Sequence, residues 1–341
     1  MKTVAFFNNK GGVGKTSLVY HLAWMFAELG YRVVAADFDP QANLTSICID
    51  EERLEQVWLT KAQSTVFSAV APLMKGIGEI IPVRLEEIIS EQPEPVSGNF
   101  ALIMGDLLLS EFEDDLSGNW TKCLGGDERA FRVTTAFSRI AASAGKSFDA
   151  DICLVDVGPN LGAINRAALI SADFVVIPAA PDLFSVQGLE NVGPRLRQWR
   201  EEWQERRGKA RPDLDFALPT GDMRPIGYVV SRHSVLAGKQ ARAFRKWLDR
   251  LPSVYREKVE SELVSDTALQ IDSDDRCLAQ LKDYRSLMPM AQEARKPMFF
   301  LKPGDGAIGG HQGAVQRCYA DFKLLAEKIA ERIGLEKSAE A

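Results

Sequence analysis

A glycine-rich stretch near the N-terminus, residues 8–17, contains the residue types that bind phosphate groups. Its sequence is NNKGGVGKTS. Glycines let backbone N–H groups point inward at one anion, and the start of a following helix adds unpaired donors and a positive dipole end. A lysine, Lys15, supplies a cation for the β- and γ-phosphates of a nucleotide, and the Thr16 hydroxyl can ligate Mg²⁺. The predicted cofactor-binding residues are Lys10, Gly11, Gly12, Val13, Gly14, Lys15, Thr16 and Ser17.

The segments on either side of this stretch support the same interpretation. Residues 3–7 are β-branched, apolar and aromatic, which predicts a buried strand. Apolar residues then recur at helical spacing from 18 to 29, and Gly30 stops the predicted helix. A strand, a glycine-rich turn and a helix in this order are the context that a phosphate-binding loop requires. The alternative, a glycine-rich turn with chance lysines, explains this agreement less well.

Two further predicted strands end in carboxylates. Residues 32–39 form an apolar run that ends in Asp37 and Asp39, and residues 151–156 form a second run that ends in Asp156. Parallel βαβ units carry their ligand groups at the carboxyl ends of the strands, so these acids are expected beside the phosphate loop. In P-loop ATPases an acid placed like Asp156 holds a magnesium-bound water. Acidic turn residues, or a helix cap in the case of Asp156, are the alternatives.

The usual pattern G-x-x-x-x-G-K-[ST] fails here, because its first position is occupied by Asn9. The sequence KGGVGKT of residues 10–16 instead resembles the deviant Walker A loop of the ParA/MinD family of P-loop ATPases. In that family a second, signature lysine, here Lys10, reaches across a dimer to the partner's nucleotide. Residues 37–43 are similar to the family's switch I, with Ala42 in place of a frequent glycine, and residues 157–162 resemble its switch II.

The resemblance implies a role for each of these residues. Catalysis would rest on Lys10, Lys15 and Asp39, of which Asp39 orients or activates the attacking water. The metal would be held by Thr16, Asp37 and Asp156, with Asp37 supporting the magnesium shell.

The resemblance also implies a fold and an activity. The expected fold is α/β, doubly wound, with a mostly parallel sheet and helices on both faces. The expected activity is weak, partner-stimulated hydrolysis of Mg-ATP by an ATP-dependent homodimer. Such ATPases bind DNA non-specifically and position plasmids, chromosomes or other cargo together with a ParB-like or other stimulating partner. The match continues through residues 165–169 and 187–189, and we expect a single domain over 1–341 with insertions within 50–150 and 205–310.

The composition limits the classes of partner. The 341 residues are 46% hydrophobic and carry a net charge of −6, so any nucleic-acid contact must come from a local basic patch. Five scattered cysteines argue against a zinc site and against a secreted disulfide framework. No signal peptide is expected before the first strand, and no apolar run approaches the ~20 residues of a membrane span. A cytoplasmic protein without membrane contact is therefore expected, associated with the nucleoid when ATP is bound.

A basic stripe near residue 245 is the candidate DNA contact. Its members fall at helical spacing and are Lys239, Arg242, Arg245, Lys246 and Arg250. Such a stripe suits the phosphate backbone of DNA, whereas an ordinary solvated helix face is the alternative. A separate expectation concerns the predicted strand 226–230. Ser231 and Arg232, at its carboxyl end, are candidates to border the adenine.

Other members of the wider family keep the loop and perform other functions. A membrane-positioning role would require a terminal amphipathic basic helix, but residues 336–341 are polar and nearly neutral. An iron–sulphur carrier would need a cysteine pair, and none is evident. A metabolic ligase similar to dethiobiotin or cobyrinate synthase stays open, because residues 50–150 leave room for a substrate pocket. A ParA-like module that serves another system, such as host defence, stays open too.

Overall fold

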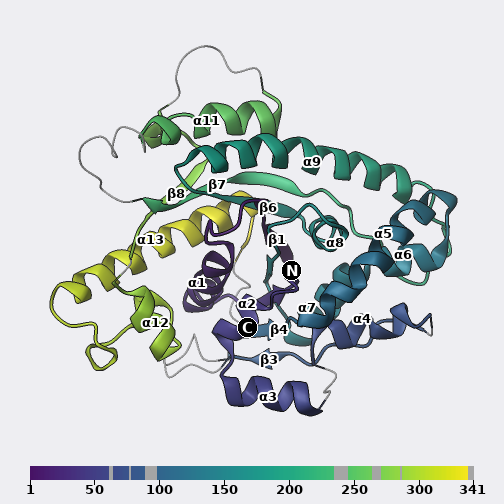
Figure 1. The fold of residues 1–341 in the computed structure, drawn as a ribbon, viewed down its shortest axis with the longest axis horizontal. Helices are drawn as coiled ribbons and strands as arrows, with labels where there is room; N and C mark the ends of the chain where they lie inside the picture. Colours follow the sequence, from purple (N-terminus) through teal and green to yellow (C-terminus); the bar gives the residue numbers. More distant parts are fainter. Residues whose placement is uncertain are drawn as a thin grey trace.

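The computed structural model describes residues 1–60, 64–76, 78–88, 98–233, 245–262, 270–284 and 286–336. Its centre is one eight-stranded sheet with the strand order β3-β4-β2-β5-β1-β6-β7-β8 (Figure 1). All neighbouring strands are parallel except β3, which pairs antiparallel with β4 at one edge. The strands are β1 (Lys2–Phe6), β2 (Val33–Asp37), β3 (Glu86–Glu87), β4 (Phe100–Ile103), β5 (Ile152–Asp156), β6 (Phe174–Ala179), β7 (Arg224–His233) and β8 (Cys277–Lys282).

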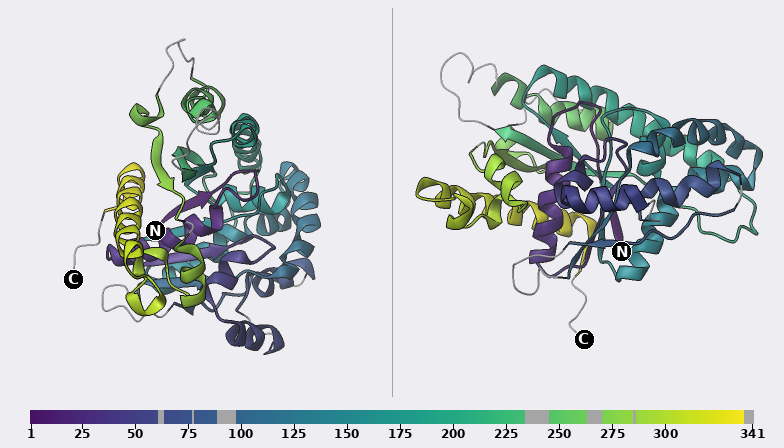
Figure 2. Two further views of the ribbon diagram at one scale, coloured as in Figure 1. Left: turned by 60° about the vertical axis from the view of Figure 1, so that its left-hand side comes forward. Right: turned by 60° about the horizontal axis from the view of Figure 1, so that its bottom comes forward.

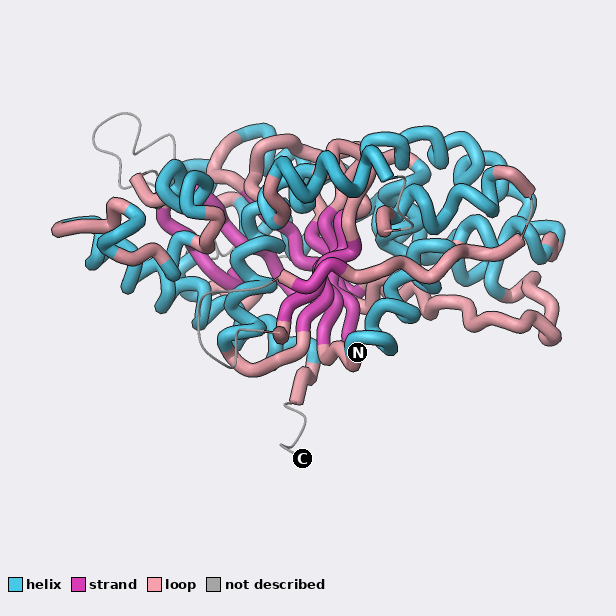
Figure 3. The backbone as a smooth tube through the Cα atoms, turned by 90° about the horizontal axis from the view of Figure 1, so that it is seen from below, coloured by secondary structure: helices cyan, strands magenta, loops and turns pink. Residues whose placement is uncertain are grey.

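Helices cover both faces of this sheet, as Figures 2 and 3 show. Alternate side chains of the central strands enter opposite hydrophobic cores: Ala5 joins one core with Phe7, which follows β1, while Val4 and Phe6 join the other. The first core contains residues of α4 (Val66–Met74), α5 (Glu113–Lys122), α6 (Glu128–Thr134), α7 (Ala136–Phe148), α8 (Ala163–Ile170), α9 (Leu183–Arg207) and α11 (Leu251–Val254). The second contains residues of α1 (Lys15–Glu28), α2 (Asn43–Cys48), α3 (Glu51–Thr60), α12 (Met288–Ala294) and α13 (Gly310–Ile333).

This arrangement confirms the predicted doubly wound, mostly parallel α/β fold. Strands β3 and β4 come from the first region of expected insertions, and β7 and β8 from the second, and all four belong to the one sheet. The assignment of residues 1–341 to a single domain stays a prediction. Within the part of the chain described above, no helix combines the length and the apolar character that crossing a membrane requires.

The register of the central strands brings three loops to one edge of the sheet. Phe6 of β1 and Asp37 of β2 both pair with Asp156 of β5. The residues that follow β1, β2 and β5 therefore leave the sheet at the same height. They contain the glycine-rich loop and the segments that resemble switch I and switch II.

Candidate nucleotide-binding site

The glycine-rich loop connects β1 to α1 and leaves the start of α1 open. Gly12 and Gly14 adopt φ values of +72° and +86°, a left-handed conformation that side chains other than glycine rarely tolerate. Gly14 is the N-cap of α1 and offers no side-chain cap, so the first N–H groups of the helix are available to an anion. This is the geometry predicted for a phosphate cradle.

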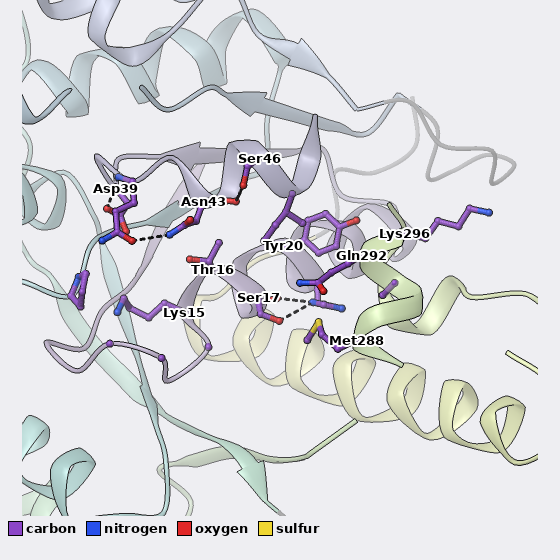
Figure 4. A pocket seen from close by; sticks show the side chains of 18 residues that line it. Lys15, Thr16, Ser17, Tyr20, Asp39, Asn43, Ser46, Met288, Gln292 and Lys296 are labelled. Atoms are coloured by element: carbon purple, nitrogen blue, oxygen red, sulfur yellow. Dashed lines mark hydrogen bonds between the residues drawn. The ribbon is translucent and has the colours of Figure 1, made fainter. Parts of the chain in front are cut away.

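Lys15 is held within this cradle. Its side chain extends into the concave side of the loop (Figure 4), and the residue is only 7% exposed. The Nζ atom donates to the carbonyl oxygens of Asn8 at 3.2 Å and Lys10 at 3.3 Å. Burial lowers the pKa of Lys15, while the nearby carboxylates of Asp156 and Asp39 oppose that effect. The Lys15 ammonium group is thus held in one orientation and, because it is buried, is poorly hydrated. Both properties favour binding of a polyphosphate.

Strand β6 and helix α9 both lie against the loop at Asn8. Asn8 donates from Nδ2 to the carbonyl oxygen of Pro178 at 2.7 Å, and its Oδ1 accepts from the Lys10 N–H at 3.0 Å. A Cβ atom on Gly188 would lie 2.8 Å from that Oδ1 atom. Gly188 therefore lets α9 approach the loop closely, which gives a physical reason for the sequence match at residues 187–189.

Lys10 points away from the cradle of its own chain. It forms an ion pair with Asp182, and its Nζ lies 3.4 Å from the Ser185 hydroxyl. Asp182 also caps α9, because its Oδ1 accepts from the Ser185 N–H at 2.9 Å. The lysine expected to serve a partner's nucleotide is thus bound to an acid of its own chain.

Asp156 is the strongest candidate for the metal shell. It is fully buried, and neither carboxylate oxygen has a hydrogen-bond partner of good geometry among the described residues. Burial raises the pKa of Asp156 well above its usual range, Asp37 and Asp39 raise it further, and the Thr16 hydroxyl and Lys15 lower it. An orphaned buried carboxyl beside a threonine hydroxyl fits a divalent cation, because a cation would restore the charged form.

The donor set suits Mg²⁺ in particular. In the part of the chain that the structure describes, no group of three or more His, Cys, Asp or Glu is arranged to hold a metal by itself. Mg²⁺ rarely uses an all-protein cage; it keeps several waters and takes one or two protein ligands plus substrate phosphates. Thr16 and Asp156 fit that description.

Both carboxylate oxygens of Asp37 accept hydrogen bonds from neighbouring residues. Its Oδ2 accepts from both the N–H of Thr45 at 2.8 Å and the Thr45 hydroxyl at 2.7 Å, and its Oδ1 accepts from the Asp39 N–H at 3.3 Å. Burial raises the pKa of Asp37, and the two hydrogen bonds from Thr45 lower it. The Thr45 hydroxyl in turn accepts from the Gly105 N–H at 2.7 Å, and a Cβ on Gly105 would lie 2.8 Å from the Asp37 carboxyl. Thr45 therefore connects Asp37 to Gly105, shortly after β4, and the role of Asp37 in the magnesium shell stays a prediction.

Thr45 and Gly105 were not singled out in the sequence. Both act through contacts between segments far apart in the chain. The only local signal was a threonine near the start of a short helix, which is common. Their importance becomes visible only once β4 lies beside β2.

Asp39 lies between the two switch-like segments. It is almost fully buried and lines the main cavity, and its Oδ1 accepts from the Gln41 N–H at 3.0 Å. A Cβ on Gly158 would lie 3.2 Å from the same oxygen. This places a carboxylate beside the loop and close to the residues after Asp156. The position is compatible with orienting a water molecule, and that role of Asp39 stays a prediction.

Two adjoining cavities open from the phosphate loop. The larger has a volume of about 680 Å³ and runs from the loop and Asp39 to α12, where it is lined by Met288 and Gln292, and by Lys296 just after the helix (Figure 4). The smaller, about 440 Å³, lies against Gly14 and Ser17 and is lined by Ser231, by the residues after β8 and again by Met288. The contribution of α12 was not predicted.

Ser231 occupies the place expected for a residue beside the base. It is buried, its hydroxyl has no hydrogen-bond partner among the described residues, and it lies next to Gly14. The side chain of Arg232 lies outside the described residues. Contact of either residue with adenine stays a prediction.

His21 connects the helix of the phosphate loop to the C-terminal part of the chain. It is buried one turn after Ser17, with Nδ1 2.7 Å from the Ser17 carbonyl oxygen and Nε2 accepting from the Met298 N–H at 3.2 Å. Its ring also stacks on Phe322, with centroids 4.9 Å apart. Burial lowers the pKa of His21 to about 4. The fold therefore requires the neutral imidazole, with Nδ1 carrying the proton.

A pH-dependent loss of stability should follow from this histidine. The folded pKa lies below the usual 6.5, so the contribution of neutral His21 is complete above pH 6.5 and is lost as the pH falls toward 4. At pH 5 the loss amounts to about 2 kcal/mol, at about 1.4 kcal/mol per pH unit. We expect the unfolding free energy of the unmodified chain to fall by that much more than that of His21→Gln between pH 7.5 and 5. Urea titrations of both proteins measure this difference, and equal pH dependence would contradict the assignment.

The predicted basic stripe is described only in part. Lys239 and Arg242 lie outside the described residues. Arg245 pairs with Asp249 at 3.0 Å and with Asp272 at 3.3 Å, so its charge is largely compensated. Lys246 and Arg250 lie over the ring of Trp247, at 5.1 and 5.5 Å from its centroid. The contact of this stripe with DNA stays a prediction.

Comparison with known proteins identifies the family. A family model described as an AAA domain matches residues 1–207. Protein IncC of Escherichia coli is 30% identical over 202 residues, which cover 59% of this chain and 47% of IncC. A ParA family protein of Chlamydia pneumoniae is 31% identical over 195 residues, which cover 56% of this chain and 64% of that protein. The chain belongs to the ParA/MinD-type P-loop ATPases.

Solved structures agree at the level of the fold. Protein DIP2308 from Corynebacterium diphtheriae superposes with a TM-score of 0.66 at 23% identity, over 98% of this chain and 99% of that one. A putative plasmid partition protein of Borrelia burgdorferi bound to AMPPNP gives a TM-score of 0.55 at 17% identity, over 97% and 98% of the two chains. The sequence match covers only about half the length of IncC.

Proposed function

We propose that this ParA-type ATPase is a switch that dimerises with Mg-ATP and opens on hydrolysis. In this proposal it positions DNA or other cargo in the cytoplasm, binds DNA non-specifically and is stimulated by a ParB-like or other partner. The observation that carries the proposal is the separation of two lysines. Lys15 is fixed inside the phosphate cradle, whereas Lys10 is directed out of it, toward Asp182.

Each residue of the site has a defined part in this proposal. The loop N–H groups and Lys15 would bind the phosphates, and Thr16 and Asp156 would hold Mg²⁺, which would supply positive charge to the β- and γ-phosphates. Asp39 accepts a hydrogen bond from the attacking water and fixes its direction. Asp37 keeps this carboxylate in place through Thr45 and the backbone of residue 39.

Dimer formation requires Lys10 to exchange one anion for another. The Lys10 and Asp182 side chains are 23% and 43% exposed, and an ion pair exposed to this extent contributes at most about 1 kcal/mol. The phosphates of a partner's ATP carry more charge and would be shielded from water in a closed dimer. The exchange is therefore favourable once two ATP-bound chains meet. Without ATP in the partner, Lys10 stays with Asp182.

DNA binding is expected to need Lys246 and Arg250. We expect Lys246→Glu with Arg250→Glu to weaken ATP-dependent DNA binding about tenfold or more at low salt, and to flatten its salt dependence. Fluorescence anisotropy with a random duplex at two salt concentrations measures both effects. Arg245→Gln is the matched control, because Arg245 is already paired with two acids and should matter less.

Two outcomes would count against this part of the proposal. Unchanged binding by the double variant would show that the described part of the stripe is a solvated face. The absence of any ATP-dependent DNA binding by the unmodified chain at low salt would argue against a role on the nucleoid.

A metabolic ligase remains the second candidate because of the larger cavity. Beyond the phosphate loop it continues to Tyr20, Gln292 and Lys296, which could accommodate a small carboxylate substrate. The two functions differ in what stimulates ATP turnover. A small carboxylate that raises turnover favours a ligase, whereas stimulation by DNA with a partner protein favours the partition-type switch.

A further inference from the structure

We infer that Glu113 is a positioning residue for ATP hydrolysis, because it fixes the segment that follows Asp156. The inference rests on the proposed ATPase function and concerns α5, an element that contributes none of the predicted site residues. Helix α5 follows β4, whereas the switch-like segment 157–162 follows β5. Glu113 joins the two.

The contact is bidentate and lies at a helix start. Glu113 Oε1 accepts from the Ala163 N–H at 2.5 Å, and Oε2 accepts from the Ile164 N–H at 2.9 Å. Helix α8 begins at Ala163 after Gly162, which has no side chain to cap it. Glu113 thus satisfies two N–H groups that α8 leaves open, and its negative charge suits the positive end of the helix dipole.

Gly162 is shaped to receive this carboxylate. A Cβ atom at this position would lie 2.6 Å from Glu113 Oε1 and 3.0 Å from the side-chain oxygen of Asn160. The backbone of Gly162 is extended in the allowed region, so the requirement for glycine is one of space rather than of torsion. The Glu113 carboxylate therefore lies in close contact with Gly162, the last residue of the switch-like segment.

The start of α8 is linked to the site through Asn165. From α8, the buried Nδ2 of Asn165 donates to the carbonyl oxygens of Gly158 and Asn160, both at 2.7 Å. Gly158 in turn lies against the Asp39 carboxylate. A shift of the first turn of α8 is thus transmitted through Asn165 to Gly158, and from there to the carboxylate proposed to orient water.

A second contact from α5 holds α8 further along. The guanidinium carbon of Arg166 lies 4.2 Å from the ring centroid of Trp120, and burial lowers the pKa of Arg166 to about 10. Arg166 neighbours Asn165 in sequence. Helix α5 therefore contacts α8 at two points. These lie on either side of Asn165, which binds the backbone of the switch-like segment.

The test compares two carboxylate caps in the same protein. Glu113→Gln removes the charge from the cap of α8, while Asp127→Asn does the same at α6, where Asp127 Oδ1 accepts from the Ala130 N–H at 2.9 Å. We expect Glu113→Gln to lower ATP turnover at saturating ATP by about tenfold, with the affinity for an ATP analogue within twofold of the unmodified chain. Asp127→Asn should change thermal stability by a similar amount but leave turnover within twofold.

Gly162→Ala tests the same contact from the other side. The added methyl group displaces the carboxylate, so turnover should fall as in Glu113→Gln, and the double variant should lose little more. Hydrogen exchange provides a readout that does not depend on turnover. The amides of Ala163 and Ile164 should exchange faster in Glu113→Gln than in Asp127→Asn.

The outcomes separate this inference from the proposed function. Equal turnover in Glu113→Gln and Asp127→Asn, or a parallel loss of turnover and affinity, would overturn the inference. An unmodified chain that binds but never hydrolyses ATP, with faster amide exchange in Glu113→Gln, would instead contradict the proposed function and leave the positioning contact standing.

Discussion

Lys15→Ala is expected to abolish nucleotide binding under conditions in which the unmodified chain is saturated. The Lys15 ammonium is the cation at the centre of the loop, and two buried carboxylates, Asp39 and Asp156, lie close enough to affect its pKa. Without the cation, those acids would repel the phosphates. Loss of a buried charge-assisted contact together with that repulsion should weaken binding at least about 100-fold, or about 2.7 kcal/mol. Titration with a fluorescent ATP analogue measures the effect.

The control for this variant lies in the same cavity. Lys296 lines the far end and pairs with Asp305, so Lys296→Ala should reduce affinity only slightly. Thermal unfolding without nucleotide should show that Lys15→Ala is folded, because burial of the lysine is itself unfavourable. Unchanged affinity in a folded Lys15→Ala protein would mean that the phosphates bind elsewhere.

The second large effect is a contrast between Lys10→Ala and Asp39→Ala. Lys10 pairs with Asp182 rather than with the cradle of its own chain, so Lys10→Ala should bind ATP nearly as well as the unmodified chain. It should not dimerise or hydrolyse ATP, because the partner's phosphates lose their neutralising charge. Asp39→Ala should bind ATP and close but turn it over at least about 100-fold more slowly, because the water is no longer oriented.

Both variants should bind ATP and release little phosphate, so their molar mass with Mg-ATP, measured by light scattering, distinguishes them: Asp39→Ala should be a dimer and Lys10→Ala a monomer. Asp182→Asn is a useful companion, since asparagine can still cap α9 but cannot hold the Lys10 charge. Normal turnover in Lys10→Ala would remove its role across the dimer. Equal loss of ATP affinity in both variants would show that they act on binding alone.

The phosphate loop could be predicted because all its chemistry is local. Residues 10–17 are consecutive, and the turn, the helix start and the lysine follow from their types and order. The same is true of Asp37 and Asp156, whose strands end in acids and pair in register. The doubly wound fold was expected from the resemblance to the ParA/MinD family, and the buried, apolar strands agree with it.

The supporting contacts could not be predicted, because they join distant segments. Thr45 meets Gly105 across 60 residues, and Glu113 meets Ala163 across 50. Strand β8, CLAQLK, contains no β-branched or aromatic residue and so lacks the usual strand signal, yet it adds a neighbour to β7. Leu107–Phe112 is a 3₁₀ helix that Asp106 caps, and the local sequence does not distinguish it from an α-helix.

The assembly of Asp39→Ala with nucleotide tests the dimerising switch most directly. Light scattering gives its molar mass in solution with saturating Mg-ATP and, separately, with Mg-ADP. The account predicts twice the monomer mass with ATP and the monomer mass with ADP, because closure needs the γ-phosphate but not the oriented water. A monomer at saturating Mg-ATP would contradict the dimerising switch.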